Sequence, residues 1–118
     1  MKAAVFDYFK PQSLQEAIGF LDQHGDAAQV MAGGQSLLAM MNLRLAAPQW
    51  LMDISGLTEL TGIESSGDIV RTGALVTHSQ LLASELVARE LPLLHRAVPH
   101  VAHLAIRNRG TVGGSLAL

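Results

Sequence analysis

The chain is organised around residues 31–38, which read MAGGQSLL. The apolar run at 28–32 predicts a short buried strand, and Ser36 opens an apolar segment that predicts a helix. Glycines carry no Cβ, so backbone N–H groups can approach an anion closely, and a helix start offers unpaired N–H donors. The stretch is therefore a candidate phosphate-binding turn; a tight strand-to-helix turn is the alternative interpretation.

A second glycine pair occurs at residues 111–117, which read TVGGSLA. The segment from residue 91 onward carries three arginines and no acidic residue, which favours an anionic ligand. Neither pair has the lysine of a Walker loop or the third glycine of the dinucleotide fingerprint. Residues 34–38 lack the second glycine of the hydrolase elbow, so Ser36 is not expected to be a nucleophile. We predict one extended anionic ligand held by both glycine motifs.

The composition excludes several classes of function. The net charge of −2 offers no basic face for nucleic acid, and the absence of cysteine excludes disulfides, thiolate zinc sites and an iron–sulfur cluster held by this chain. No apolar run is long enough to span a membrane. Asp7 and Lys10 stand where a signal peptide needs its apolar stretch, so we expect a cytoplasmic location. Only 15% of residues are charged, which indicates a partly covered surface.

The first half of the chain predicts alternating strands and helices. Ser13 and Glu16 form a capping-box pattern, and Gly25 is a typical helix stop. The expected elements are strands at 3–9, 28–32 and 50–54, the first two parallel, and helices at 14–24 and 36–45. The second helix is apolar on nearly every side, which predicts a buried or interface helix. Ser55-Gly56 marks the expected boundary between a first subdomain, 1–56, and a second, 57–118.

The second half predicts a hairpin followed by short helices. The turn residues of the hairpin are expected at 65–67. The expected elements are strands 61–64 and 68–72, a helix capped by Thr77 and ending at Ala83, a short turn capped by Ser84, and a helix from Pro92 towards His103. Pro99 should kink or split the last helix. The final apolar residues follow directly on the second glycine motif, so we expect an N-terminal piece of a longer protein.

The titratable side chains predict no catalytic centre. His100 and His103 could share a helix face, but no carboxylate or cysteine stands nearby to complete a metal site, so capping or packing is the other interpretation. His78, which follows Thr77 in a glycine-preceded turn, is a better candidate for ligand contact. We predict no catalytic and no metal-binding residue. Such a chain suits a protein that holds a cofactor and leaves the chemistry to it.

Six segments resemble a known family. They are 32–38 (AGGQSLL), 40–41 (MM) with 43–46 (LRLA), Asp53-Ile54, Gly73-Ala74, Thr77-His78 and 107–117 (RNRGTVGGSLA). Their order and spacing resemble the N-terminal part of the FAD-binding medium subunit of the molybdenum hydroxylases, the family of carbon monoxide dehydrogenase and xanthine dehydrogenase. The resemblance covers the whole chain.

The resemblance implies an α+β fold of the two-subdomain FAD-binding type, shared with vanillyl-alcohol oxidase flavoproteins, with the second subdomain incomplete. It implies FAD as the cofactor, held between the subdomains. The implied FAD contacts are Ala32, Gly33, Gly34, Gln35, Ser36, Thr77, His78, Thr111, Val112, Gly113, Gly114 and Ser115. Val101 and Ala102 match family positions near FAD less firmly.

The resemblance also implies an oxidoreductase function. A molybdopterin large subunit oxidises the substrate, an iron–sulfur small subunit relays the electrons, and the flavin of this subunit passes them to an acceptor; these two subunits are the expected partners. The family protein is much longer than this chain, so the isolated fragment is expected to be inactive. The alternatives are a remnant or assembly module without functional FAD binding, self-association through exposed core surface, and another nucleotide in the same loops.

Overall fold

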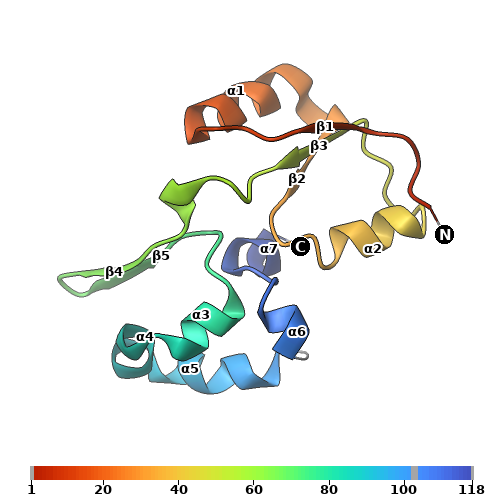
Figure 1. Cartoon of the computed structure of the whole chain (residues 1–118). Coiled ribbons are helices and arrows are strands. Elements are labelled where there is room, and N and C mark those ends of the chain that lie inside the picture. Colours follow the sequence, from red (N-terminus) through yellow and green to blue (C-terminus); the bar gives the residue numbers. More distant parts are fainter. Residues whose placement is uncertain (1, 102–103, 118) are drawn as a thin grey trace. The chain divides into compact units, whose positions relative to one another are not determined.

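The computed structural model describes residues 2–101 and 104–117, so Ala102 and His103 lie outside the described residues. The chain divides into two compact units, Met1–Thr58 and Glu59–Leu118, which are described separately. Both contain helices and strands, and the expected α+β class is confirmed (Figure 1). The boundary after residue 56, as one between FAD-binding subdomains, stays a prediction. Within the described ranges, no helix has the length and apolar character needed to cross a membrane.

The first unit is built on a three-stranded parallel sheet. Its strands are β1 (Asp7–Phe9), β2 (Ala28–Met31) and β3 (Trp50–Asp53), in the order β1-β3-β2. The expected strand at 3–9 was too long, because β1 pairs with β3, which itself has only four residues. The predicted parallel direction of β1 and β2 is confirmed, with β3 between them. The carboxyl ends of all three strands therefore share one edge, where the first glycine motif leaves β2.

Helix α1 (Leu14–His24) has the bounds that the sequence predicted. Ser13 accepts a hydrogen bond from the Glu16 N–H at 3.0 Å, which caps the first turn. Gly25 ends the helix at a φ of 54° and starts the 3-10 turn η1 (Gly25–Ala27). These local signals act over a few residues, so they can be read directly from the sequence.

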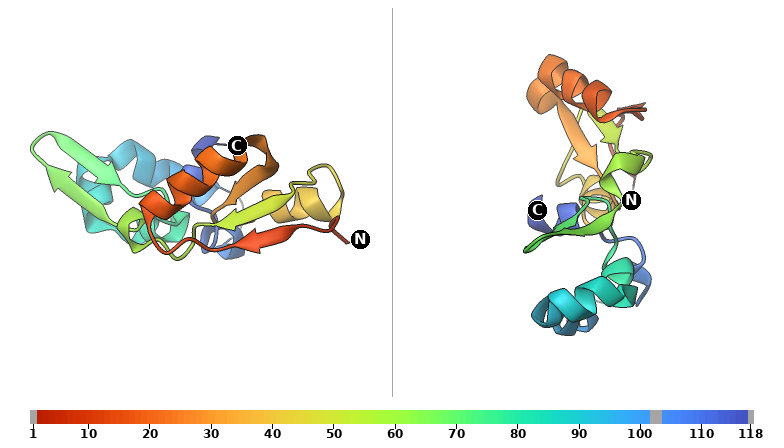
Figure 2. Two further views of the ribbon diagram at one scale, coloured as in Figure 1. Left: turned by 90° about the horizontal axis from the view of Figure 1, so that it is seen from above. Right: turned by 90° about the vertical axis from the view of Figure 1, so that its left-hand side faces the viewer.

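Helix α1 lies on one face of the sheet (Figures 1 and 2), and aromatic side chains pack between the helix and the strands. Phe20 stacks on Phe9 with ring centroids 4.4 Å apart and meets Trp50 edge-on at 5.2 Å. The His24 ring lies 4.1 Å from Phe20 and 5.1 Å from Trp50. Such pairs stabilise by about 0.5–1.5 kcal/mol each beyond their burial. Helix, first strand and third strand thus form one small core.

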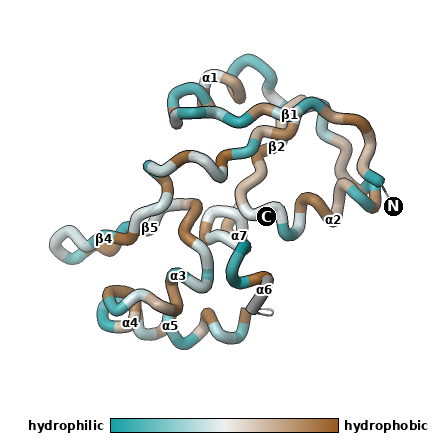
Figure 3. The backbone as a smooth tube through the Cα atoms, in the orientation of Figure 1, coloured by the Kyte–Doolittle hydropathy of each residue, from teal (hydrophilic) through white to brown (hydrophobic). Residues whose placement is uncertain are grey.

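Helix α2 (Leu37–Asn42) is shorter than the predicted helix at 36–45. Arg44 adopts a left-handed φ of 59°, and the Leu45 N–H bonds to the Met40 carbonyl at 2.8 Å while the Arg44 N–H bonds to Met41 at 3.0 Å. This pair of bonds is a Schellman motif, which normally has glycine at the left-handed position, so the early end of the helix could not be predicted from the sequence. Met41 is buried, but Leu38 and Met40 are exposed, and the tube in Figure 3 colours part of this helix as hydrophobic. The expectation of a buried helix was wrong; that of an interface helix stays a prediction.

The second unit begins with the predicted hairpin. Strands β4 (Ile63–Ser66) and β5 (Ile69–Thr72) pair antiparallel after the 3-10 turn η2 (Thr58–Leu60). The turn lies at Gly67 and Asp68 rather than at 65–67, because Ser66 already pairs with Ile69. Gly67 has a φ of 60°, which a two-residue hairpin turn requires.

Five short α-helices follow among the residues of the second unit that the structure describes. They are α3 (His78–Ala83), α4 (Glu85–Glu90), α5 (Pro92–Ala97), α6 (Leu104–Arg107) and α7 (Val112–Ala117), with the 3-10 turn η3 (Val98–His100) after α5. The predicted split at Pro99 is confirmed, since α5 ends at Ala97. Val76, Leu81, Val87 and Val98 form the buried core.

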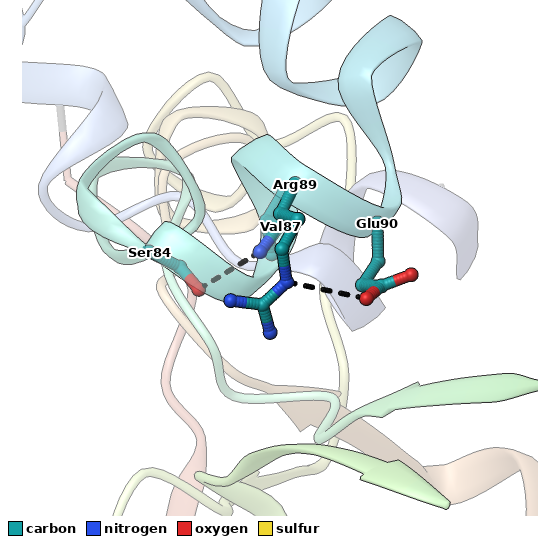
Figure 4. A network of polar contacts seen from close by, with 4 residues as sticks. All are labelled: Ser84, Val87, Arg89 and Glu90. Carbon is teal, nitrogen blue, oxygen red and sulfur yellow. Dashed lines mark hydrogen bonds and ion pairs between the residues drawn. The ribbon is translucent and has the colours of Figure 1, made fainter. Parts of the chain in front are cut away.

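The segment after Ser84 corrects one expectation. Ser84 caps the helix α4 rather than a short turn: its Oγ accepts from the Val87 N–H at 3.2 Å (Figure 4). Arg89 and Glu90 form an exposed ion pair at 3.2 Å on the same helix. Val87 is buried in the core, and this packing extends the turn into a helix.

Candidate functional site

The first glycine motif forms the turn between β2 and α2. Gly34 has a φ of 76°, a left-handed conformation that side chains rarely adopt. A Cβ there would come within 3.0 Å of the Leu38 side chain and 3.3 Å of the Met31 sulfur. The turn therefore leaves no room for a side chain at Gly34. Gln35 and Ser36, which follow it, are exposed to solvent.

The backbone of this turn has unused hydrogen-bond donors. In the described part of the chain, the N–H groups of residues 33–36 donate to no protein acceptor, whereas the next bonds are Leu38 N–H to Gly34 O and Met40 N–H to Ser36 O. Successive free N–H groups at a turn form a concavity that binds anions. This geometry fits the predicted phosphate-binding turn.

Ser36 precedes helix α2, which begins at Leu37, whereas the sequence predicted that the helix begins at Ser36 itself. It has helical backbone angles (φ −88°, ψ −43°), and its side chain makes no capping hydrogen bond. Its exposed hydroxyl is thus not engaged by the start of α2. The hydroxyl adds a fifth potential donor beside the four N–H groups.

The second glycine motif is built differently. The first motif is a turn, but Gly113 and Gly114 of the second motif lie in the first turn of helix α7. Thr111 is buried and caps this helix, accepting from the Gly114 N–H at 3.0 Å. The reason is tertiary: a bridge between Thr77 and Thr111 aligns the segment, and the Val112 N–H bonds to the Val76 carbonyl at 2.9 Å.

The N–H donors of this second motif are already used inside the protein. The Gly113 N–H bonds to the Ala74 carbonyl at 2.8 Å, and the Ser115 N–H bonds to the Thr111 carbonyl at 3.1 Å. A Cβ on Gly113 would lie 2.9 Å from that Ala74 oxygen, so Gly113 serves close packing. Gly114 is exposed and its Cβ would meet the Thr111 Oγ1. The backbone N–H groups of residues 112–115 are therefore not available to bind a ligand.

Thr77 and His78 hold the second motif in place. Thr77 caps α3 in a complete capping box with Gln80. His78 is 8% exposed, and the Nε2 of its ring lies 2.9 Å from the Ser115 Oγ. The ring also borders a cavity of about 310 Å³ lined mainly by apolar side chains such as Leu81 and Val98. The structure brings His78 and Ser115 together, a pairing that the sequence did not predict.

The buried carboxylate of Asp53, beside the first glycine motif, was not predicted from the sequence to have a role in the site. Asp53 ends β3, pairs with Met31 at the end of β2, and accepts hydrogen bonds from the Tyr8 hydroxyl and from the Ser55 N–H. Burial alone would raise the pKa of Asp53, but the hydrogen bonds from Tyr8 and Ser55, with the charge of Lys10, hold that pKa below its usual range. The same contact raises the pKa of Tyr8. Only the tertiary fold joins two side chains 45 residues apart.

The histidine pair gives no metal site that the structure can describe. His103 lies outside the described residues, and His100 belongs to η3. Among the described residues, no group of three His, Asp or Glu side chains is placed to hold a metal ion.

Comparison with known proteins identifies the family. Residues 4–118 match the family model described as the FAD binding domain in molybdopterin dehydrogenase. The carbon monoxide dehydrogenase medium chain of Hydrogenophaga pseudoflava is 45% identical over 112 residues, which are 95% of this chain and 39% of that protein. The caffeine dehydrogenase subunit beta of a Pseudomonas species is 38% identical over 98% of this chain and 39% of that protein.

Solved structures agree with this assignment. The structure of quinoline 2-oxidoreductase from Pseudomonas putida 86 superposes with a TM-score of 0.95 at 45% identity, over 99% of this chain and 41% of that one. The chain thus spans about two fifths of the length of the proteins it matches. The resemblance stated from the sequence is confirmed, and FAD is the cofactor of the group. The chain belongs to the FAD-binding domain family of the molybdopterin dehydrogenases.

Proposed function

We propose that this chain is the FAD-binding, N-terminal portion of a medium subunit that carries electrons in a molybdenum hydroxylase. The observation that carries the proposal is the turn at 33–36, whose four backbone N–H groups donate to no acceptor in the described part of the chain. In a chain of this family, such a turn suits the pyrophosphate of FAD. Bound FAD would supply the electron-accepting chemistry.

The first unit would act by binding and orienting. Residues 32–36 would surround phosphate oxygens with N–H groups, and the Ser36 hydroxyl would add one hydrogen bond. Asp53 supports the base of this turn, because it lies in register with Met31 and the Ile54 N–H bonds to the Met31 carbonyl at 3.0 Å. Its carboxylate is held by Tyr8 and Ser55 and would fix the turn rather than meet the phosphate.

The second unit would contribute side chains rather than backbone donors. Thr77, His78 and residues 111–115 are proposed contacts or supports for FAD. Because the N–H groups of 112–115 are bonded within the protein, hydroxyl groups are the donors that this motif can offer.

Partners and location follow from the relatives and remain part of the proposal. The matched proteins are named as subunits or chains of dehydrogenases, which supports assembly with an iron–sulfur small subunit and a molybdopterin large subunit in the cytoplasm. Electrons would pass from the iron–sulfur subunit through flavin to an acceptor. The isolated 118 residues would be inactive, because the chain spans about two fifths of its relatives.

The alternative is an assembly module without functional FAD binding. The exposed apolar side chains after α2 favour it: Leu43 is 53% and Leu45 is 73% exposed. Contiguous exposed apolar surface marks an interaction site, including self-association. FAD uptake separates the two functions, since an assembly module would stay colourless after incubation with FAD.

The test is a fluorescence titration of the purified protein with FAD, with two glycine variants. Gly34→Ala places a methyl group in the phosphate turn, whereas Gly67→Ala imposes the same left-handed strain in the hairpin, where a Cβ meets nothing within 4 Å. Backbone strain should cost each variant about 1 kcal/mol, and Gly34→Ala should lose more because its Cβ also meets the Leu38 and Met31 side chains. Only Gly34→Ala should weaken FAD binding, by at least tenfold. Equal FAD affinity in both variants would contradict the proposed site, and no uptake by the wild type would favour the assembly module.

A further inference from the structure

Ser115 is an exposed residue of the second glycine motif whose hydroxyl group could still bond to a ligand. The N–H groups of residues 112–115 are bonded to Val76, Ala74 and Thr111. The Thr111 hydroxyl is buried under α7, whereas Ser115 is exposed. What this motif can donate to an anion therefore depends on where the Ser115 proton points.

The direction of that proton is coupled to the His78 ring. Nε2 of His78 lies 2.9 Å from the Ser115 Oγ, and a hydroxyl can either accept a proton from the ring or donate its own. If Nε2 is bare, Ser115 donates to it and no proton is left for a ligand. If Nε2 carries the hydrogen, Ser115 accepts and its own proton turns away from the ring.

Burial and neighbouring contacts hold the His78 ring in one position. His78 is 8% exposed, its backbone N–H bonds to the Gly110 carbonyl at 3.1 Å, and its Cδ2 lies 3.1 Å from where a Gly110 Cβ would stand. Among the described residues, no group hydrogen-bonds to Nδ1, so a hydrogen on Nδ1 would have no protein acceptor, whereas a hydrogen on Nε2 can be donated to the Ser115 Oγ.

We propose that His78 is a positioning residue: its Nε2–H donates to the Ser115 Oγ, which directs the Ser115 hydroxyl proton to a phosphate oxygen of the cofactor. This inference rests on the proposed function. His78 would then act through Ser115 and not touch FAD itself. A Cβ at Gly110 would lie 3.0 Å from the Ile106 carbonyl oxygen and 3.1 Å from the ring, so Gly110 leaves the ring room in this position.

The tautomer can be measured without any cofactor. Nitrogen-15 NMR of the wild-type protein at alkaline pH, where imidazole is neutral, separates a protonated from a bare ring nitrogen. The His78 signals are assigned by their loss in His78→Leu. We expect hydrogen on Nε2 and a bare Nδ1. Hydrogen on Nδ1 would overturn the inference whatever the protein binds.

Variants then test the link to the ligand. Ser115→Ala should weaken FAD binding roughly tenfold or more, as expected for a lost hydrogen bond to a charged group. His78→Leu should weaken it by several-fold, and His78→Gln, whose amide N–H can replace Nε2–H, should restore affinity to within about threefold of wild type. Urea unfolding of each variant would show that the fold is kept.

The double variant gives the decisive comparison. In the Ser115→Ala background, His78→Leu should cause no further loss of FAD affinity, because His78 acts through the hydroxyl. A further loss of the same size as in the wild type would show direct contact by His78 and overturn the inference. If the wild type itself binds no FAD, the proposed function fails, while the NMR result still decides the direction of the hydrogen bond.

Discussion

Gly113→Ala tests whether the second glycine pair is required for packing. The added Cβ would lie 2.7 Å from the Ala74 Cβ and 2.9 Å from the Ala74 carbonyl oxygen, so α7 must move or the Gly113–Ala74 hydrogen bond must lengthen. Overpacking of this kind costs about 1–3 kcal/mol. The better helix propensity of alanine returns up to about 1 kcal/mol. We therefore expect a net loss of about 1–2 kcal/mol in the free energy of unfolding.

The assay is urea and thermal unfolding followed by far-ultraviolet circular dichroism, which reports the helices. A loss of this size lowers the midpoint temperature by roughly 5–15 °C in a small domain. Gly19→Ala is the matched control, since Gly19 is also helical but a Cβ there meets nothing within 4 Å. It should stabilise by about 0.5–1 kcal/mol. If Gly113→Ala stabilised the protein as Gly19→Ala does, the close approach of α7 to Ala74 would be refuted.

Three further predictions concern the first unit. Tyr8→Phe removes a hydrogen bond to Asp53, so the pKa of Asp53 in the folded protein should rise. A lowered carboxyl pKa stabilises the folded protein above the unfolded pKa of about 4, and this stabilisation is lost as the pH falls, so the melting temperature of the variant should begin to fall at a higher pH than that of the wild type. Melting temperatures that differ by the same amount at every pH would refute this. Arg44→Gly should stabilise by about 0.5–1 kcal/mol in urea unfolding by relieving the left-handed strain, and a lower midpoint would mean that the Arg44 side-chain hydrogen bond to the Lys2 carbonyl matters more. Ser13→Ala should cost about 1 kcal/mol through the lost cap, with Ser13→Asp as the control that keeps it.

Local signals account for the successful part of the fold prediction. The Ser13 cap and Gly25 stop give α1 its predicted bounds, Thr77 starts α3, and Pro99 ends the helix before it. Each acts on a neighbouring turn through a hydrogen bond or a missing N–H, so no distant residue is needed. Strand ends were less well predicted, because the length of β1 depends on its partner β3.

In the candidate site too, the local features could be predicted from the sequence and the long-range ones could not. Gly34 needs its left-handed conformation for a local turn, and the sequence placed that turn correctly between a strand and a helix. Whether the backbone N–H groups of each motif are hydrogen-bonded within the protein depends on residues far away in the sequence. Those of 33–36 meet no acceptor among the described residues, whereas those of 112–115 are bonded partly to Ala74 and Val76, nearly forty residues earlier in the chain.

The sequence by itself determined the class of fold, the family and the two glycine motifs, because residue types at fixed spacing carry that information. The tertiary structure decided which motif stays open. Pairing of Thr77 with Thr111 draws the second motif into a capped helix, and the His78–Ser115 contact leaves one exposed hydroxyl. A glycine pair looks the same in sequence whether its missing side chains make room for a ligand or for a neighbouring backbone, and only packing distinguishes the two.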